Sequence, residues 1–195
     1  MTIRRACEIA IAMAALCVAA PLAVVTMLLV WLNFGRPIFF RQVRSGLAGR
    51  PFTVWKFRSM PDRRDADGVS LPDAARLTRF GRMLRRSRMD ELPQLLSVLA
   101  GDMAIVGPRP LLPETIAAAG RTGVERGKVR PGLTGWAQVS GNTLLTEHEK
   151  IMLDLWYIDH RSAASDLVVV LRTLAIPFLG ERRDVVALRR ASCGP

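Results

Sequence analysis

Two adjacent carboxylates, Asp90 and Glu91, are the first residues of this chain whose types and spacing could do chemistry. Three arginines lie just before them: Arg85, Arg86 and Arg88. A carboxylate could attack an electrophilic centre while guanidinium groups neutralise the charge of an anionic substrate. The alternative is helix capping, because acidic residues stabilise helix starts through the helix dipole.

A second candidate is the string Val106–Pro110, in which Pro108 and Pro110 flank Arg109. The two prolines restrict the backbone on both sides of one guanidinium group. An arginine held in this way suits bidentate binding of phosphate oxygens. An ordinary loop with an exposed arginine is the alternative.

A third string runs from Val129 to Val139 and contains Arg130, Trp136 and Gln138 around a Pro-Gly turn. The indole face could stack on a nucleobase, and the amide could hydrogen-bond its edge. A tryptophan packed in a small core is an equally good interpretation. Three scattered acids could add to a cation site, although each alone is typical of a protein surface: Asp154, Asp159 and Asp166.

The composition limits the classes of protein that this chain could be. Its 195 residues support one domain, half of the residues are hydrophobic, and the formal net charge is +11. A positive mean hydropathy of +0.20 beside an isoelectric point near 11.2 indicates membrane association and an anionic partner. Two histidines and three widely spaced cysteines make a catalytic triad, a zinc site or a disulfide framework improbable.

The N-terminus is the most apolar part of the chain. Between Glu8 and Arg36 lie 27 residues without a charged side chain, which as a helix would measure about 40 Å, too long for a signal peptide. Pro21 follows Ala20 in the middle, and arginines flank both ends. This arrangement favours a re-entrant membrane hairpin over residues 1–36, kinked at Ala20-Pro21, with both ends on one face of the membrane. A single tilted span is the alternative.

The remaining chain predicts an α+β fold that is mainly helical. Alternating residues predict a small β-hairpin from strands Arg36–Val43 and Phe52–Arg58. A polar loop spans Pro61 to Pro72, and an amphipathic, arginine-rich helix is expected from Ala74 to Ser87. Such a helix suits the surface of an anionic membrane, and a nucleic-acid-binding helix would look similar.

A second helix is predicted to begin with Asp90 at its N-cap and Pro93 in its first turn, and to end at Gly101. The apolar stretch Leu167–Leu179 is too interrupted to span a membrane and predicts a core or interfacial segment. We expect a catalytic domain over residues 37–180 and a basic tail over 181–195.

Taken together and in this order, these strings closely resemble the bacterial sugar transferases, the monotopic polyprenyl-phosphate phosphoglycosyl transferases. The resemblance covers nearly the whole chain in a short, one-domain form. The matching strings are Trp55–Met60, Arg76–Gly81, Asp90–Leu95, Gly101–Met103, Val106–Pro110, Val129–Val139 and Asp154–Tyr157.

The resemblance implies transfer of a sugar-1-phosphate from a UDP-sugar to undecaprenyl phosphate on the cytoplasmic face of the bacterial inner membrane, the first membrane step of glycan assembly. It assigns Asp90 as the nucleophile that forms an aspartyl phosphosugar and releases UMP, with Glu91 beside it and Mg²⁺ held by both. Anionic lipids are expected partners, and nucleic acid is not. The residues expected to bind substrate are Lys56, Arg58, Arg85, Arg88, Pro108, Arg109, Arg130 and Gln138.

Two positions depart from the family pattern. Ala20 stands where a serine often precedes the kink proline, and Asn142 stands where an arginine is common, which leaves the sugar open. The pathway and the formation of a homo-oligomer also stay open. Two other classes of function are weighed: a non-catalytic membrane scaffold of the same fold, and a membrane-tethered nucleic-acid binder.

Overall fold

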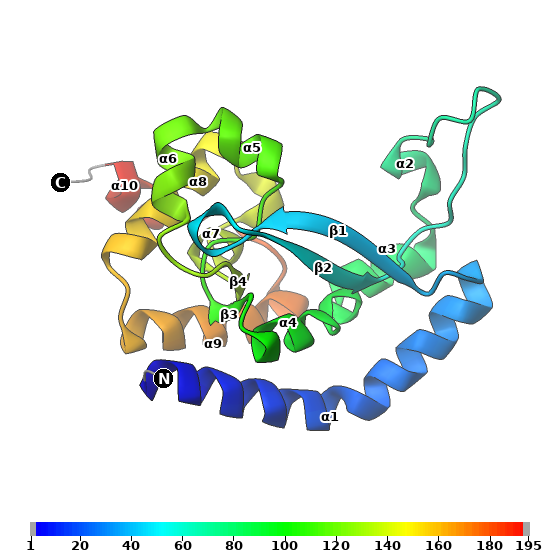
Figure 1. The fold of residues 1–195 in the computed structure, drawn as a ribbon, viewed down its shortest axis with the longest axis horizontal. Coiled ribbons are helices and arrows are strands. Elements are labelled where there is room, and N and C mark those ends of the chain that lie inside the picture. The colour runs from blue at the N-terminus through cyan, green and yellow to red at the C-terminus, as the bar shows by residue number, and fades with distance from the viewer. Residues whose placement is uncertain (1–2, 193–195) are drawn as a thin grey trace.

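The computed structural model describes residues 3–192, which form a helical body with two small sheets, underlain by one long helix (Figure 1). The predicted class, mainly helical α+β, is confirmed. The elements, in chain order, are α1 (Ile3–Phe34), β1 (Phe39–Ser45), β2 (Pro51–Phe57), α2 (Asp73–Arg76), α3 (Arg79–Arg86), α4 (Gln94–Ala100), β3 (Ala104–Val106), α5 (Pro113–Ala118), α6 (Gly120–Arg126), β4 (Gly132–Thr134), α7 (Trp136–Val139), α8 (Glu147–Asp159), α9 (Ala163–Leu179) and α10 (Val185–Ser192).

Helix α1 is continuous through Ala20 and Pro21, and it curves along the underside of the body in Figure 1. In the part of the chain that the structure describes, it is the one helix long and apolar enough to cross a membrane. Its buried residues come from both halves of the helix and mark the face that packs on the body: Glu8, Ala12, Thr26 and Val30. Most of its other large apolar side chains are exposed.

Both ends of α1 are held by the same body. At the N-terminal end, the Arg4 guanidinium lies 2.7 Å from the Asp166 carboxylate at the start of α9. At the other end, the rings of Phe34 and Phe80 lie 5.6 Å apart, and Arg58 donates hydrogen bonds to the carbonyls of Phe34 and Arg36.

The β-hairpin forms as predicted, with boundaries shifted by a few residues. Strands β1 and β2 pair antiparallel, from Phe39 opposite Phe57 to Ser45 opposite Pro51. Pairing starts two residues after Pro37, which has no N–H group to donate to a ladder. The second sheet is a short parallel pair of β3 and β4.

The single helix predicted over 74–87 is instead two helices, α2 and α3. The backbone is extended at Leu77, and the Thr78 hydroxyl accepts a hydrogen bond from the Gly81 amide, which caps α3. A threonine that satisfies the amides of a new helix start competes with continuation of the preceding helix. A side chain at Gly81 would meet the Ser59 carbonyl at 1.9 Å, so α3 lies directly against the chain that leaves β2.

The prediction that Asp90 caps the second helix is wrong. Met89–Glu91 form a 3-10 turn, Pro93 occupies the N-cap of α4, and helix residues begin at Gln94. Because Pro93 has no N–H group, it cannot bond to the Met89 carbonyl four residues earlier, and the amide of Leu92 bonds to that carbonyl in a 3-10 turn instead. The predicted stop at Gly101 is confirmed, with a φ of 97°.

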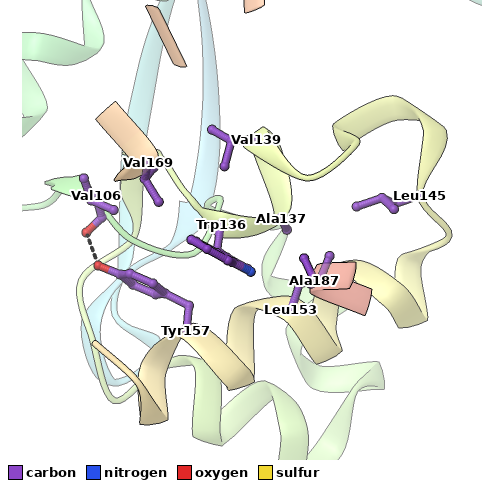
Figure 2. Close-up of a cluster of buried hydrophobic side chains, with 9 residues drawn as sticks. All are labelled: Val106, Trp136, Ala137, Val139, Leu145, Leu153, Tyr157, Val169 and Ala187. Carbon is purple, nitrogen blue, oxygen red and sulfur yellow. Dashed lines mark hydrogen bonds between the residues drawn. The ribbon is translucent and has the colours of Figure 1, made fainter. Parts of the chain in front are cut away.

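The main core lies between α7, α8, α9 and α10 (Figure 2). Trp136, Leu153 and Tyr157 fill it, and the Tyr157 hydroxyl donates to the Val106 carbonyl at the end of β3. Ala187 of α10 is buried there, so residues 181–192 of the predicted basic tail are part of the body. Positions 193–195 lie outside the described residues.

Helix α9 contains the apolar stretch that the sequence predicted to be a core or interfacial segment, and it has one buried side and one exposed side. Val169 packs in the core, while four residues on another side are 58–87% exposed: Leu167, Leu171, Leu174 and Phe178. Their spacing of three and four residues forms one apolar stripe, which we call the α9 stripe. The N-terminal half of α1 lies next to α9 in Figure 1.

Candidate active site

A cavity of about 1300 Å³ lies between the β-hairpin, the end of α3, the 3-10 turn at Met89–Glu91 and the segment that joins α9 to α10. Asp90 and Glu91 are part of its wall, and the cationic side chains of Lys56 and Arg109 line it with them. The cavity is larger than a typical small-molecule pocket, and its lining has an excess of positive charge. An anionic ligand is therefore favoured.

Glu91 is fixed by cations on several sides. Its Oε1 accepts from Lys56 Nζ at 2.6 Å and from Arg109 Nη2 at 3.0 Å, while Arg88 Nη1 lies 3.4 Å from Oε2. Burial alone would raise the pKa of Glu91, but Arg109 and Lys56 overcome this effect and hold the pKa at about 2. Glu91 is therefore an anion at every physiological pH.

Asp90 has the opposite environment. Its side chain is buried, and Oδ1 has no hydrogen-bond partner. Burial, followed by the negative charge of Glu91, raises the pKa of Asp90 to about 6, against the pull of Lys56, Arg85 and Arg109. At neutral pH the group is still mostly ionised, but its oxygen is more basic and less solvated than that of an ordinary aspartate.

Two further predicted arginines lie on the cavity wall. Arg85 donates to the Ser59 hydroxyl at 2.9 Å, which holds it between α3 and the end of β2. Arg58 donates to the carbonyls at the end of α1, and its guanidinium lies over the Phe34 ring at 5.8 Å. Arg58 thus joins the wall of the cavity to the end of α1.

The structure does not bring every predicted residue to the cavity. Gln138 is buried and donates to the Leu133 carbonyl, and Arg130 donates to the Gly101 carbonyl at the end of α4. Trp136 packs 5.1 Å from the Trp156 ring in the main core, as the core interpretation expected. The Pro108 carbonyl accepts a hydrogen bond from the Gly132 amide. This bond holds the loop around Arg109, residues 107–110, which we call the arginine loop.

The carboxylates are suited to share a divalent cation with a ligand rather than to enclose one. Among residues 3–192, no group of three or more acidic, histidine or cysteine side chains could hold a metal. Asp154 is paired with Arg126, and Asp166 with Arg4, so these acids are engaged elsewhere. Asp90 retains a free oxygen, and Mg²⁺ is usually bound by one or two carboxylates together with substrate phosphates.

Two residues near the cavity were missed by the sequence analysis. Glu181 accepts hydrogen bonds from Asn142 and Thr143 and lies 3.8 Å from Arg88, so it ties the α9–α10 segment to the cavity wall. Arg126 is buried beside Asp154 behind the arginine loop. Neither has a sequence signal, because each acts through contacts between residues far apart in the chain.

Comparison with known proteins defines the class. The model of the bacterial sugar transferase family matches residues 1–180, and the chain belongs to this family. An uncharacterized sugar transferase of Bacillus subtilis, EpsL, is 44% identical over 93% of this chain and 90% of its own length.

Two further relatives carry a more detailed name, UDP-glucose:undecaprenyl-phosphate glucose-1-phosphate transferase. The protein of Xanthomonas campestris is 44% identical over 75% of this chain, and that of Caulobacter vibrioides is 41% identical over 80%. The matched part is 32% of the Xanthomonas protein and 62% of the Caulobacter protein, so those relatives are longer.

Proposed function

We propose that this protein is a phosphoglycosyl transferase that moves a sugar-1-phosphate from a UDP-sugar to undecaprenyl phosphate. The family membership and the names of the relatives support this class of reaction. The observation that carries the proposal is the pair of neighbouring carboxylates in a cationic cavity, in which Glu91 is neutralised by cations and Asp90 keeps an unpartnered oxygen.

Asp90 is the nucleophile in this mechanism. Its carboxylate attacks the phosphorus that bears the sugar, an acyl phosphate bond forms, and the bond to UMP breaks. An oxygen of the lipid phosphate then attacks the same phosphorus, which yields the polyprenyl diphosphate sugar and restores the Asp90 carboxylate. Lys56, Arg85 and Arg109 offset the charge of the diphosphate, whose repulsion would otherwise oppose an anionic nucleophile.

Asp90 and Glu91 would hold Mg²⁺ together with the diphosphate. The ion would neutralise charge on the phosphate oxygens and so assist the departure of UMP. Because the oxygens of Glu91 already accept from Lys56, Arg109 and Arg88, the unpartnered Oδ1 of Asp90 is the ligand atom with unused capacity. Glu91 then serves mainly to orient the cations around the reacting phosphate.

The membrane placement that fits this reaction is monotopic, on the cytoplasmic face of the bacterial inner membrane. Both ends of α1 are bound to one body, which supports a helix that enters and leaves the bilayer on the same side. Arg58 joins the end of α1 to the cavity wall, so a lipid phosphate at the membrane surface could reach the dyad. The net charge of +11 favours contact with anionic lipids.

A transfer assay tests the proposal. Purified protein in detergent is incubated with Mg²⁺, undecaprenyl phosphate and UDP-sugars labelled in the sugar, and we expect label in the lipid extract and stoichiometric UMP. The Asp90→Asn variant should form neither product. Folded wild-type protein that transfers no sugar from any UDP-sugar in a broad panel would favour a scaffold, and salt-sensitive DNA binding without turnover would favour a nucleic-acid binder.

A further inference from the structure

The most deeply buried ion pair among the described residues lies outside the cavity. Arg126 ends α6 and Asp154 lies on α8, and their side chains are only 5% and 2% exposed. Arg126 Nε and Nη2 both donate to Asp154 Oδ2, at 3.0 and 2.5 Å. Burial of two charges costs several kcal/mol that such a pair barely recovers, so stability alone is a weak reason for its presence.

A third hydrogen bond connects this pair to the cavity. Arg126 Nη2 also donates to the backbone carbonyl of Arg109 at 2.9 Å. The residue after Arg109 is Pro110, which has no N–H group, so the loop has one backbone donor fewer at this point. From the fixed backbone, the Arg109 guanidinium reaches Glu91 at 3.0 Å.

The neighbouring backbone is anchored on its other side. Gly107 donates to the Thr134 carbonyl, and Gly132 donates to the Pro108 carbonyl, both at 2.9 Å. A side chain at Gly107 would meet the Arg130 carbonyl at 2.5 Å, so the loop packs tightly on the chain that enters β4. The hydrogen bond from Arg126 therefore fixes the loop backbone at Arg109 itself, the residue whose guanidinium enters the cavity.

We propose that Arg126 is a positioning residue for Arg109, and that Asp154 orients Arg126 for this role. An apolar pair could fill the same space, but it could not donate to the Arg109 carbonyl. Loss of that bond would let the loop shift, and a displacement of about 1 Å in a positioned group can reduce a rate by about 100-fold. This inference rests on the proposed function for its main readout, the transfer of a sugar phosphate.

The decisive variant replaces the pair by apolar residues, Arg126→Met with Asp154→Ala. It removes both buried charges together, so no unpaired ion is left and the fold should persist. We expect a thermal unfolding temperature close to wild type and a loss of about 10- to 100-fold in kcat/KM. Arg172→Lys is the matched control, because Arg172 pairs with Asp184 outside the cavity and should leave turnover unchanged.

A double-mutant cycle with Arg109 separates positioning from general support. If Arg126 acts through Arg109, Arg126→Lys should reduce kcat/KM strongly in wild type and by less than about threefold in an Arg109→Lys background. A folded apolar double variant with near wild-type kcat/KM would overturn the proposal. If that double variant does not fold, effects of Arg126→Lys and Arg109→Lys that multiply independently would overturn it.

Failure of this inference can be told from failure of the proposed function. Absence of transfer by wild-type protein rejects the function before any variant is compared. Transfer by wild type with an additive cycle leaves the function intact and rejects only the role of Arg126.

Discussion

At the scale of single residues, the site depends on two neighbouring carboxylates in opposite environments. Three cations lie within 3.4 Å of the oxygens of Glu91, whereas Asp90 Oδ1 is buried without a partner. The difference places the pKa of Glu91 at about 2 and that of Asp90 at about 6. One group is thus a constant anion, and the other is a basic, poorly solvated oxygen suited to attack.

This difference in pKa predicts that replacing each carboxylate by its amide will have opposite effects on the stability of the protein. The raised pKa of Asp90 means that stability from this group is present below pH 3.8 and lost as pH rises to about 6, so at pH 7.5 Asp90→Asn should stabilise the protein by about 1–3 kcal/mol. The lowered pKa of Glu91 means that its contribution is present above pH 4.5 and lost as pH falls towards 2. Glu91→Gln should therefore destabilise at pH 7.5 by a similar amount.

Thermal unfolding of the two variants in the same detergent at pH 5 and pH 7.5 measures these effects. The gain from Asp90→Asn should shrink at pH 5, where wild-type Asp90 is mostly protonated. An Asp90→Asn variant with a lower unfolding temperature than wild type at pH 7.5 would contradict this prediction. It would show that the ionised carboxylate of Asp90 stabilises the fold.

Arg109 should be sensitive to the shape of its cation as well as to its charge. One side of the Arg109 guanidinium contacts Glu91, and the remaining N–H groups are available for phosphate oxygens. Arg109→Lys keeps the charge and loses the planar fork, so we expect a fall of about 10- to 100-fold in kcat/KM with little change in unfolding temperature. Turnover close to wild type would mean that Arg109 contributes only its charge.

At the scale of elements, sequence patterns predicted the helices and the hairpin better than the boundaries between successive helices. The long apolar helix, the β-hairpin and the stop at Gly101 follow from local composition. The break at Leu77 and the 3-10 turn before Pro93 depend on which hydrogen bonds a threonine and a proline allow. The spacing of apolar residues along a helix does not reveal where such hydrogen bonds end it.

The same distinction applies to the site. The resemblance to the family assigned Asp90, Glu91, Lys56 and Arg109 to one site, and in the structure all four line one cavity. Gln138 was expected at the ligand, but its string folds into the core, where burial of Trp136 determines its position.

Helix α1 should have both ends on one side of the membrane. Single cysteines are introduced at Ile3 and Arg50, which are both exposed, after replacement of the native cysteines. In spheroplasts, a reagent that cannot cross membranes should label neither site until the membrane is opened. Labelling of position 3 alone from outside would show that α1 spans, and the ion pair of Arg4 with Asp166 could not then form in the membrane-bound protein.

At the scale of the whole molecule, the apolar surface is concentrated on one side. Helices α1 and α9, which carry many of the large exposed apolar side chains, lie on the underside in Figure 1, and α5 and α6 lie on the opposite side. Exposed apolar surface of this extent indicates contact with lipid. The body should therefore rest on the membrane through α9 as well as through α1.

Spin labels at two exposed positions test this orientation. Phe178 is 87% exposed in α9, and Val124 is 70% exposed in α6. In liposomes, a label at position 178 should be accessible to oxygen and protected from a water-soluble nickel reagent, whereas a label at position 124 should show the reverse. Equal accessibility of both labels to the nickel reagent would mean that α9 faces water.

The central claim is that Asp90 attacks phosphorus, and intact-mass measurement of the protein tests it most directly. Wild-type protein is incubated briefly with Mg²⁺ and a UDP-sugar that it uses, without lipid, and then quenched in acid. We predict a mass increase of one sugar phosphate and release of UMP, both lost in Asp90→Asn and retained at a lower rate in Glu91→Gln. Release of UMP only when undecaprenyl phosphate is also present, with no adduct under any quench, would contradict the claim and assign the attack to the lipid phosphate itself.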